Sequence, residues 1–322
     1  MAGGVERTAT SESPSSPVHL APSGRQVMPK ITLYLGAHKT ATTHLQGMLG
    51  LGRAWLAGRG IALSLPQDLR KTWLPGFFTW VGNQGRTSID TLTAELREIM
   101  PISGRWIVAE ENILGVSNDL MTRAGLYPMA GERLLGLMQL FEQADIELFF
   151  SIRSYADFYR SAYSEVVRNR GYVPFSQFYD ESRFAGNSWL QMVRDLQQHI
   201  PEEKMTLWCY EDFRSLLPTL VQLITGEESV EELLAFGSNE PTRPSLSHKT
   251  MEILGLLDPV LSRKETLALV ERINRAYPVS QENRVFDPFT PGQKAAMHAR
   301  YLEDVARIRE EFPRLRFLGA AH

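Results

Sequence analysis

The chain has 322 residues, and 34 Lys and Arg against 37 Asp and Glu give it a formal net charge of −3 at pH 7. This charge argues against a dedicated nucleic-acid-binding protein, which normally contains a strongly basic domain. Hydrophobic residues make up 43% and charged residues 22% of the chain, as in ordinary globular proteins. The single cysteine excludes an intrachain disulfide and a cysteine-based zinc site.

Residues 1–29 are rich in Ser, Pro, Gly and Thr and lack the apolar centre of a signal peptide. We predict that they form a disordered tail before a domain over 30–322. No run of apolar residues in the sequence is long enough to span a bilayer. We therefore expect a cytoplasmic protein without a membrane span.

The first stretch with recognisable chemistry follows a predicted strand over 31–35. Gly36 ends this strand, a short polar turn carries Lys39, and a helix is predicted from about 42 to 58. A turn of this kind binds phosphate or sulfate, because N–H groups at the helix N-terminus and the helix dipole attract anions. It is not a Walker A loop, which requires a second Gly directly before the Lys. The alternative interpretation is a plain strand–helix connection.

After a short predicted strand over 61–63, residues 71–86 are predicted to be irregular. This stretch has two Trp and two Phe around a Pro-Gly turn. We weigh two hypotheses for it: an acceptor-binding wall for sugars or aromatic alcohols, and a hydrophobic lid or subunit contact.

A buried strand is predicted over 105–112, and it ends in two carboxylates, Glu110 and Glu111, followed by Asn112. Ligands of open α/β sheets bind at the carboxyl ends of the strands. A carboxylate at such an end is a candidate general base. The competing interpretation is a carboxylate that caps the next turn or pairs with an Arg.

A helix predicted over 131–143 leads to a strand over 146–152, and Arg153 follows that strand directly. Ser161 lies eight residues later, in a helix predicted to begin near Tyr155. A guanidinium at a strand end and a hydroxyl on the next helix can converge on one anion. Arg168 and Arg170, further along this helix, are expected on a solvated face.

The remaining sequence is predicted to contain one more strand, over 205–210, among helices. Cys209 lies in this strand and is expected to be a buried structural thiol. Glu211, directly after it, is expected to serve in capping and pairing. A Pro-rich turn near 240–247 then begins a helical part from about residue 245.

Together these stretches resemble the P-loop-like sulfotransferase family, in a soluble bacterial-type form, over about residues 30–250. The turn at 39–43 resembles the family's 5′-phosphosulfate loop, with Ala41 where the family often has Gly. The spacing of Arg153 and Ser161 resembles its 3′-phosphate site, and Glu111 occupies the position of a strand-end base. The resemblance implies an α/β fold with a central, mainly parallel sheet flanked by helices.

The resemblance further implies transfer of a sulfuryl group from 3′-phosphoadenosine 5′-phosphosulfate (PAPS) to a hydroxyl or amine of a carbohydrate or small-molecule acceptor. The product would be 3′,5′-adenosine bisphosphate (PAP). Lys39 would stabilise the developing charge, and Glu111 would take the acceptor proton. His38 and His44 are rival bases, and His38 is the one that flanks the transfer site. The residues implied in cofactor binding are Lys39, Thr40, Ala41, Thr42, Thr43, Arg153 and Ser161, with Arg243 and Ser245 from a late segment.

Three other functions remain open. A nucleotide-dependent kinase on a related fold would use a similar loop, but it normally needs a Walker A sequence and an acidic Mg²⁺ ligand. A non-catalytic member would bind the nucleotide or a sulfated glycan as a sensor. An interaction protein would use its Arg-rich helix only to contact anions. The seven His residues show no metal-ligand spacing.

Overall fold

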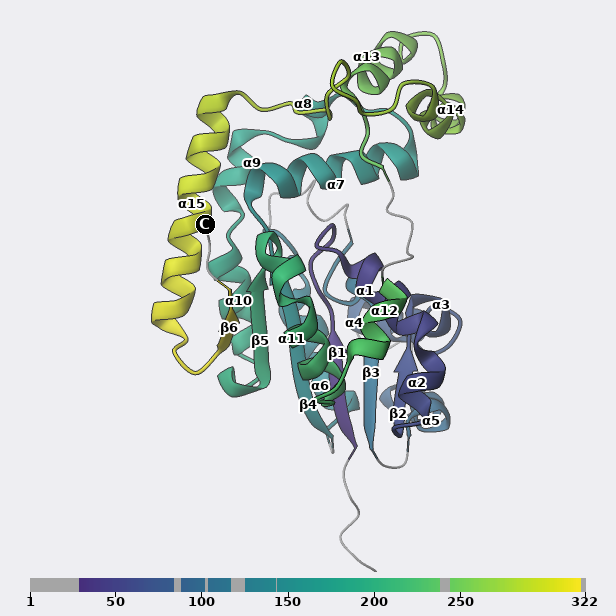
Figure 1. Cartoon of the computed structure of the whole chain (residues 1–322), viewed down its shortest axis with the longest axis vertical. Helices are drawn as coiled ribbons and strands as arrows, with labels where there is room; N and C mark the ends of the chain where they lie inside the picture. Colours follow the sequence, from purple (N-terminus) through teal and green to yellow (C-terminus); the bar gives the residue numbers. More distant parts are fainter. Residues whose placement is uncertain are drawn as a thin grey trace, which may run out of the picture.

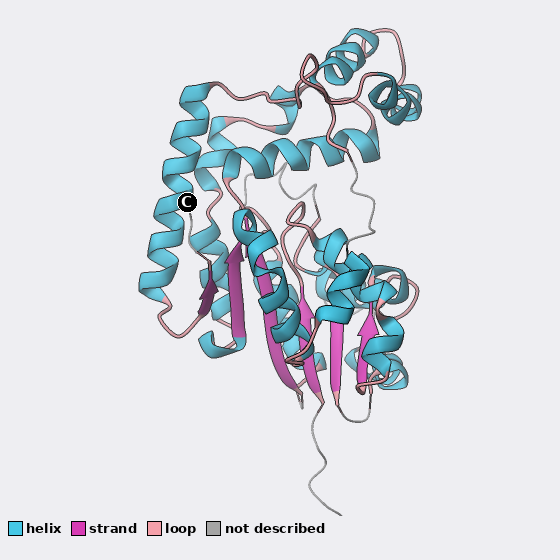
Figure 2. Cartoon of the chain, in the orientation of Figure 1, coloured by secondary structure: helices cyan, strands magenta, loops and turns pink. Residues whose placement is uncertain are grey.

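A single sheet of six parallel strands forms the centre of the molecule, in the order β2-β3-β1-β4-β5-β6. The computed structural model describes residues 29–83, 88–101, 104–116, 125–142, 144–237 and 244–319. Helices cover both faces of the sheet (Figures 1 and 2). This arrangement confirms the predicted α/β class with a parallel sheet. The strands are β1 Lys30–Tyr34, β2 Ile61–Ser64, β3 Arg105–Ala109, β4 Asp145–Ile152, β5 Met205–Cys209 and β6 Arg316–Leu318.

Most of the described chain outside the sheet is helical. Two short 3₁₀ turns follow strand ends, Glu111–Ile113 after β3 and Tyr210–Asp212 after β5, and a third, Glu202–Lys204, precedes β5. The α-helices are α1 Thr42–Leu51, α2 Arg53–Ala57, α3 Pro66–Leu69, α4 Leu74–Asn83, α5 Ile89–Ile99, α6 Ala130–Leu140, α7 Tyr155–Arg170, α8 Phe175–Phe178, α9 Glu181–Gly186, α10 Trp189–Gln197, α11 Phe213–Thr225, α12 Glu231–Gly237, α13 His248–Leu257, α14 Arg263–Ala276 and α15 Pro291–Glu311.

The two faces of the sheet belong to two separate hydrophobic clusters, because successive side chains of a strand point to opposite faces. Leu33 and Leu148 lie in the larger cluster, together with apolar residues of α4, α5, α6 and α10. Tyr34 and Phe149, one position further along the same strands, lie in the cluster formed with α1, α11 and α12. Both faces are covered, which explains why the strands are almost uniformly apolar.

The strand order creates a switch point between β1 and β4. From β1 the chain proceeds to β2 and β3 on one side, and from β4 to β5 and β6 on the other. At such a point the connections leave the two central strands in opposite directions, and ligands of open α/β sheets bind outside the carboxyl ends of these strands. Helix α7 crosses above these strand ends (Figure 1). The predicted anion loop follows β1, and Arg153 follows β4.

The C-terminal part returns to the sheet. Helix α15 packs against α10 and α7, and β6 then pairs with β5 in parallel. The carboxylate of Asp304 on α15 accepts hydrogen bonds from the Tyr155 hydroxyl and the backbone N–H of Trp189, at 2.5 and 2.9 Å. This buried carboxylate joins α15 to the starts of α7 and α10. β6 was not predicted, since only a helical part was expected after residue 245.

The helix predicted from 42 to 58 is interrupted at Gly52, where α1 ends and α2 begins. The prediction for 71–86 was wrong, because residues 74–83 form α4. Trp73 and Phe77 are four residues apart, which places them on one side of the chain as it enters this helix. They are 1% and 0% exposed in the core, so these two side chains form neither an acceptor wall nor a lid. Phe78 and Trp80 are half-buried, and for them both hypotheses stay untested. Residues 84–86 lie outside the described residues.

The prediction for Arg168 was also wrong. Its side chain is 3% exposed and lies 2.9 Å from Glu271 on α14, measured from Nε to Oε1. Its Nη2 donates to the carbonyl of Pro244 at 2.5 Å. The guanidinium therefore fastens the segment before α13, and also α14, to α7. Arg170 is exposed, as expected.

Candidate active site

The turn between β1 and α1 has an unusual backbone. Lys39 and Ala41 have φ values of 66° and 61°, and they are the only residues other than glycine with positive φ in the described chain. Ala41 is the N-cap of α1, and no side chain caps this helix. Left-handed backbone in non-glycine residues is costly and clusters at functional sites. An uncapped helix start leaves backbone N–H groups available to a ligand. That the N–H groups of residues 40–43 bind an anion stays a prediction.

The turn is fixed against the end of β4 by hydroxyl groups. Thr40 is fully buried; its Oγ1 donates to the carbonyl of Ala37 and accepts from Ser151 Oγ, both at 2.5 Å. A Cβ at Gly36 would lie 3.1 Å from Ser151 Oγ, so glycine allows this close approach. The hydroxyl of Thr40 thus holds the loop, and only its backbone N–H can serve a ligand. Thr42 is buried and Thr43 is exposed.

Arg153 joins the β4 end to the same turn. Its Nη1 donates to the carbonyl of Lys39 at 2.5 Å, and its guanidinium lies 4.2 Å from the ring centroid of Tyr210. Its Nε is buried without a hydrogen-bond partner, and no carboxylate of the described chain forms an ion pair with it. Burial lowers the pKa of this guanidinium, although Tyr210, Asp157 and Glu211 act in the opposite direction. The Arg153 charge is therefore only partly compensated.

Helix α7 contributes a carboxylate to the turn. Glu165 Oε2 lies 3.3 Å from Lys39 Nζ, and Glu165 Oε1 accepts from Asn169 Nδ2 at 3.0 Å. Ser161 lies one helical turn before Glu165 and is half-buried. No hydrogen bond joins Ser161 to Arg153 in the described chain, so their convergence on one anion remains a prediction.

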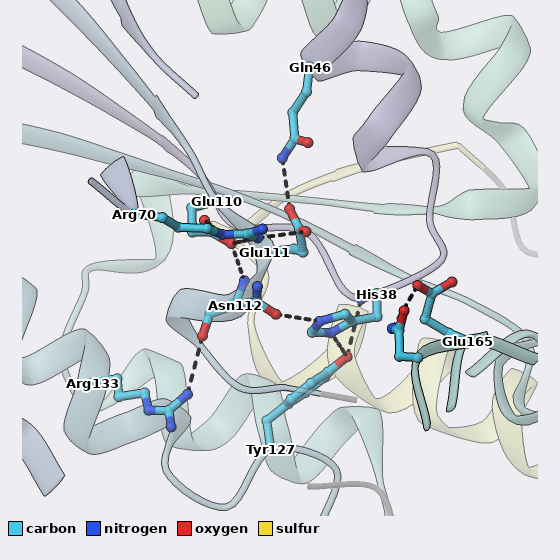
Figure 3. A network of polar contacts seen from close by, with 10 residues as sticks. His38, Gln46, Arg70, Glu110, Glu111, Asn112, Tyr127, Arg133 and Glu165 are labelled. Atoms are coloured by element: carbon cyan, nitrogen blue, oxygen red, sulfur yellow. Dashed lines mark hydrogen bonds and ion pairs between the residues drawn. The ribbon is translucent and has the colours of Figure 1, made fainter. Parts of the chain in front are cut away.

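The two carboxylates after β3 have different environments (Figure 3). Glu110 is fully buried, and both of its oxygens accept from Arg70 at 2.7 Å. Glu110 Oε1 also accepts the backbone N–H of Asn112 at 3.0 Å. Glu110 is therefore the carboxylate that caps the turn and pairs with an arginine.

Glu111 is 20% exposed and makes fewer and longer hydrogen bonds than Glu110. Its Oε2 accepts from Gln46 Nε2 of α1 at 2.8 Å, and its Oε1 lies 3.4 Å from Arg70 Nη2. The hydroxyl of Tyr34 is buried without a hydrogen-bond partner. Burial and the charge of Glu111 raise the pKa of that hydroxyl. Of the two carboxylates, Glu111 is the more exposed, at 20% against 0% for Glu110.

His38 precedes the loop lysine and has both ring nitrogens engaged (Figure 3). Nε2 lies 2.9 Å from Asn112 Oδ1, and Nδ1 lies 3.0 Å from the Tyr127 hydroxyl. Because the amide oxygen can only accept, this arrangement assigns the proton of a neutral imidazole to Nε2. The hydroxyl of Tyr127 also accepts the backbone N–H of His38. The imidazole is 8% exposed.

No hydrogen bond of the described chain joins Ser245 of the late segment to the strand ends, so its role in cofactor binding stays a prediction. Arg243 lies outside the described residues. Ser245 is exposed, and its carbonyl accepts from Asn274 Nδ2 at 3.2 Å. Glu211 has the structural role that was expected: it accepts from the backbone N–H of Ser154 and from the Tyr301 hydroxyl.

Four residues of this site were not predicted from the sequence: Gln46, Arg70, Tyr127 and Glu165. Gln46 had a usable signal, because it lies four residues after Thr42 and so on the same face of α1. The other three come from segments whose approach to the turn is not encoded locally. In the described chain, no helix is long and apolar enough to cross a membrane, and no group of three or more His, Cys, Asp or Glu could hold a metal ion.

No protein-family model matches the sequence, and no curated protein matches it. Among solved structures, the chain is similar to a sulfotransferase from Alicyclobacillus acidocaldarius. The two are 14% identical, the likeness covers 88% of this chain and 95% of the other, and the TM-score is 0.42. A likeness this distant carries no conclusion about activity, which has to come from the residues at the strand ends.

Proposed function

We propose that this chain is a sulfotransferase that uses PAPS and transfers its sulfuryl group to a hydroxyl or amine of a carbohydrate or small molecule. One observation carries the proposal: the uncapped start of α1, with Lys39 beside it, is tied directly to Arg153 at the end of β4. N–H groups and two cationic residues thus lie just after the carboxyl ends of the neighbouring strands β1 and β4. Such a site suits a ligand with more than one anionic group.

The residues present fit the donor. The N–H groups of 40–43 and the Lys39 ammonium would hold the 5′-phosphosulfate, and Arg153 with Ser161 would hold the 3′-phosphate. Arg153 has a buried, only partly compensated charge, for which a phosphate is a suitable counter-ion. When bound, the donor supplies a sulfuryl group activated as a phosphosulfate anhydride.

The chain's own residues would act on charge and on one proton. Lys39 and the N–H groups of the turn would stabilise the negative charge that develops on the 5′-phosphate side. Glu111 would accept the proton of the acceptor hydroxyl, since it is partly exposed while Glu110 is buried and fully bound. His38 is a weaker candidate because both of its ring nitrogens already have partners.

Calorimetric titration with PAP, 5′-AMP and ATP tests the donor. We expect micromolar binding of PAP that requires the 3′-phosphate and is about 100-fold weaker in Arg153→Ala. Arg194→Ala is the matched control, because Arg194 is paired with Glu311 on the surface between α10 and α15.

Equal binding of ATP without a preference for the 3′-phosphate would overturn the proposal in favour of a kinase. Binding of PAP without transfer of the sulfuryl group from PAPS to any acceptor, in a screen of hydroxyl and amine acceptors, would favour a non-catalytic sensor. If none of the nucleotides binds, the sulfotransferase, kinase and nucleotide-sensor hypotheses are all ruled out.

A further inference from the structure

The ion pair between Lys39 and Glu165 joins the anion loop to α7. The side chains are 27% and 19% exposed, so the pair is shielded from most of the solvent. Asn169, one turn further along α7, holds the second oxygen of Glu165. One oxygen of the Glu165 carboxylate thus contacts Lys39, and the other accepts a hydrogen bond from its own helix.

A carboxylate here has a clear electrostatic consequence. The turn gathers helix N–H groups, Lys39 and Arg153, all of which favour an anion, whereas Glu165 opposes one. The other acidic side chains near the start of α7 have different partners. Asp157 is paired with Arg160 at 2.5 Å, and Glu211 accepts from Ser154 and Tyr301. Among these three carboxylates, Glu165 is the one that contacts Lys39.

We infer that Glu165 is a positioning residue for Lys39, which holds the ammonium beside the turn and lowers the affinity of the turn for anions. An ammonium group has three N–H donors, so Lys39 can contact Glu165 and an anion at the same time. Glu165 would then keep the lysine aimed at the loop and also weaken retention of an anionic product. The nucleotide part of this inference rests on the proposed function.

Glu165→Gln keeps the shape of the side chain and removes its charge. We expect this variant to bind PAP, and also inorganic pyrophosphate, about threefold to tenfold more tightly than the wild type in low-salt calorimetry. Glu252→Gln is the matched control, since Glu252 forms a 3.0 Å pair with Lys249 on the exposed face of α13. A purely structural role of Glu165 would weaken binding on substitution, not strengthen it.

Two further measurements distinguish positioning of Lys39 from simple charge repulsion between Glu165 and the anion: the kinetics of Glu165→Gln, and its effect when Lys39 is also replaced. In the slow release of sulfate from PAPS with water as acceptor, Glu165→Gln should lower KM and also lower kcat severalfold. In the Lys39→Ala background the gain in affinity should shrink. An equal gain with and without Lys39 would show that Glu165 acts only as a distant charge, and this would overturn the positioning role.

Binding of PAP and binding of pyrophosphate together distinguish a failure of this inference from a failure of the proposed function. Unchanged binding of PAP by Glu165→Gln would overturn the inference and leave the sulfotransferase proposal standing. Tighter binding of pyrophosphate without any binding of PAP would support the inference and overturn the proposal. Failure of both ligands to bind would overturn both.

Discussion

The guanidinium of Arg153 donates a hydrogen bond to the carbonyl oxygen of Lys39, with 2.5 Å between Nη1 and the oxygen. The two residues are 114 positions apart in the chain. This contact joins the end of β4 to the turn after β1, on either side of the switch point. Arg153 therefore has two roles in the proposed site: it supports the anion loop and it supplies a cation for the ligand.

Because of this double role, Arg153→Lys and Arg153→Ala should differ. Lysine keeps the charge but not the planar group that lies over Tyr210 and reaches the Lys39 carbonyl. We expect PAP binding to fall about 100-fold in Arg153→Ala and less in Arg153→Lys, as charge-assisted bonds contribute roughly 1.5–3 kcal/mol. Calorimetry measures the affinities, and equal loss in both variants would assign the effect to the loop support alone.

The identity of the base can be tested with two substitutions. Glu111→Gln retains a group that can contact Gln46 but cannot accept a proton. We expect kcat to fall by about 10²–10⁴-fold, with the affinity for PAP nearly unchanged, as for loss of a general base. His38→Asn serves as the comparison and should cost less. A larger loss of kcat in His38→Asn would transfer the role of base to the histidine.

Asp304 is expected to be one of the most sensitive positions for stability. Its carboxylate, on a residue that is 6% exposed, accepts from Tyr155, Ser188 and Trp189. Asp304→Ala would leave these donors buried without partners, at a cost of roughly 3–5 kcal/mol. The free energy of unfolding in urea measures the change. Glu303→Ala, at an exposed position of the same helix, should stay within about 0.5 kcal/mol of the wild type.

The buried thiol of Cys209 makes stability depend on alkaline pH. Burial raises its pKa from 9.0 to about 11. The thiolate is disfavoured in the folded state, so the unfolded chain ionises first as the pH rises. The contribution of the buried neutral thiol to the free energy of unfolding is fully present below pH 9 and is lost as pH rises through about 11. We expect wild type to lose about 2 kcal/mol more than Cys209→Ala between these limits. Urea unfolding at several pH values measures the difference, and parallel curves would contradict the prediction.

Substitutions at Gly226 and Gly60 distinguish the cost of steric crowding by an added Cβ from the cost of backbone strain at positive φ. Both have positive φ, 77° and 69°. A Cβ at Gly226 would lie 2.6 Å from the Arg105 guanidinium, whereas a Cβ at Gly60 would meet nothing within 4 Å. Gly60→Ala should cost about 1 kcal/mol from backbone strain. Gly226→Ala should cost about 1 kcal/mol more, because Arg105 must leave the C-terminal carbonyl of α11 that it contacts. Thermal unfolding compares the two variants.

The sequence by itself determined where the first five strands lie along the chain. It also determined the turn that contains Lys39 and the placement of Glu111 and Arg153 at strand ends. These features have local signals: apolar runs, a Gly before a polar turn, and polar residues directly after a strand. β6 has only three residues, Arg316–Leu318, too few for a periodic pattern. It forms because the edge of β5 is available for pairing.

Only the tertiary structure decided which polar groups meet. Arg70 pairs with Glu110, Gln46 contacts Glu111, and Glu165 contacts Lys39, across 40, 65 and 126 positions of the chain. Such contacts depend on how several elements pack at once, and no local propensity encodes them. The same reason explains Arg168, whose charge suggested a solvated face until the packing of α7 against α14 enclosed it beside Glu271.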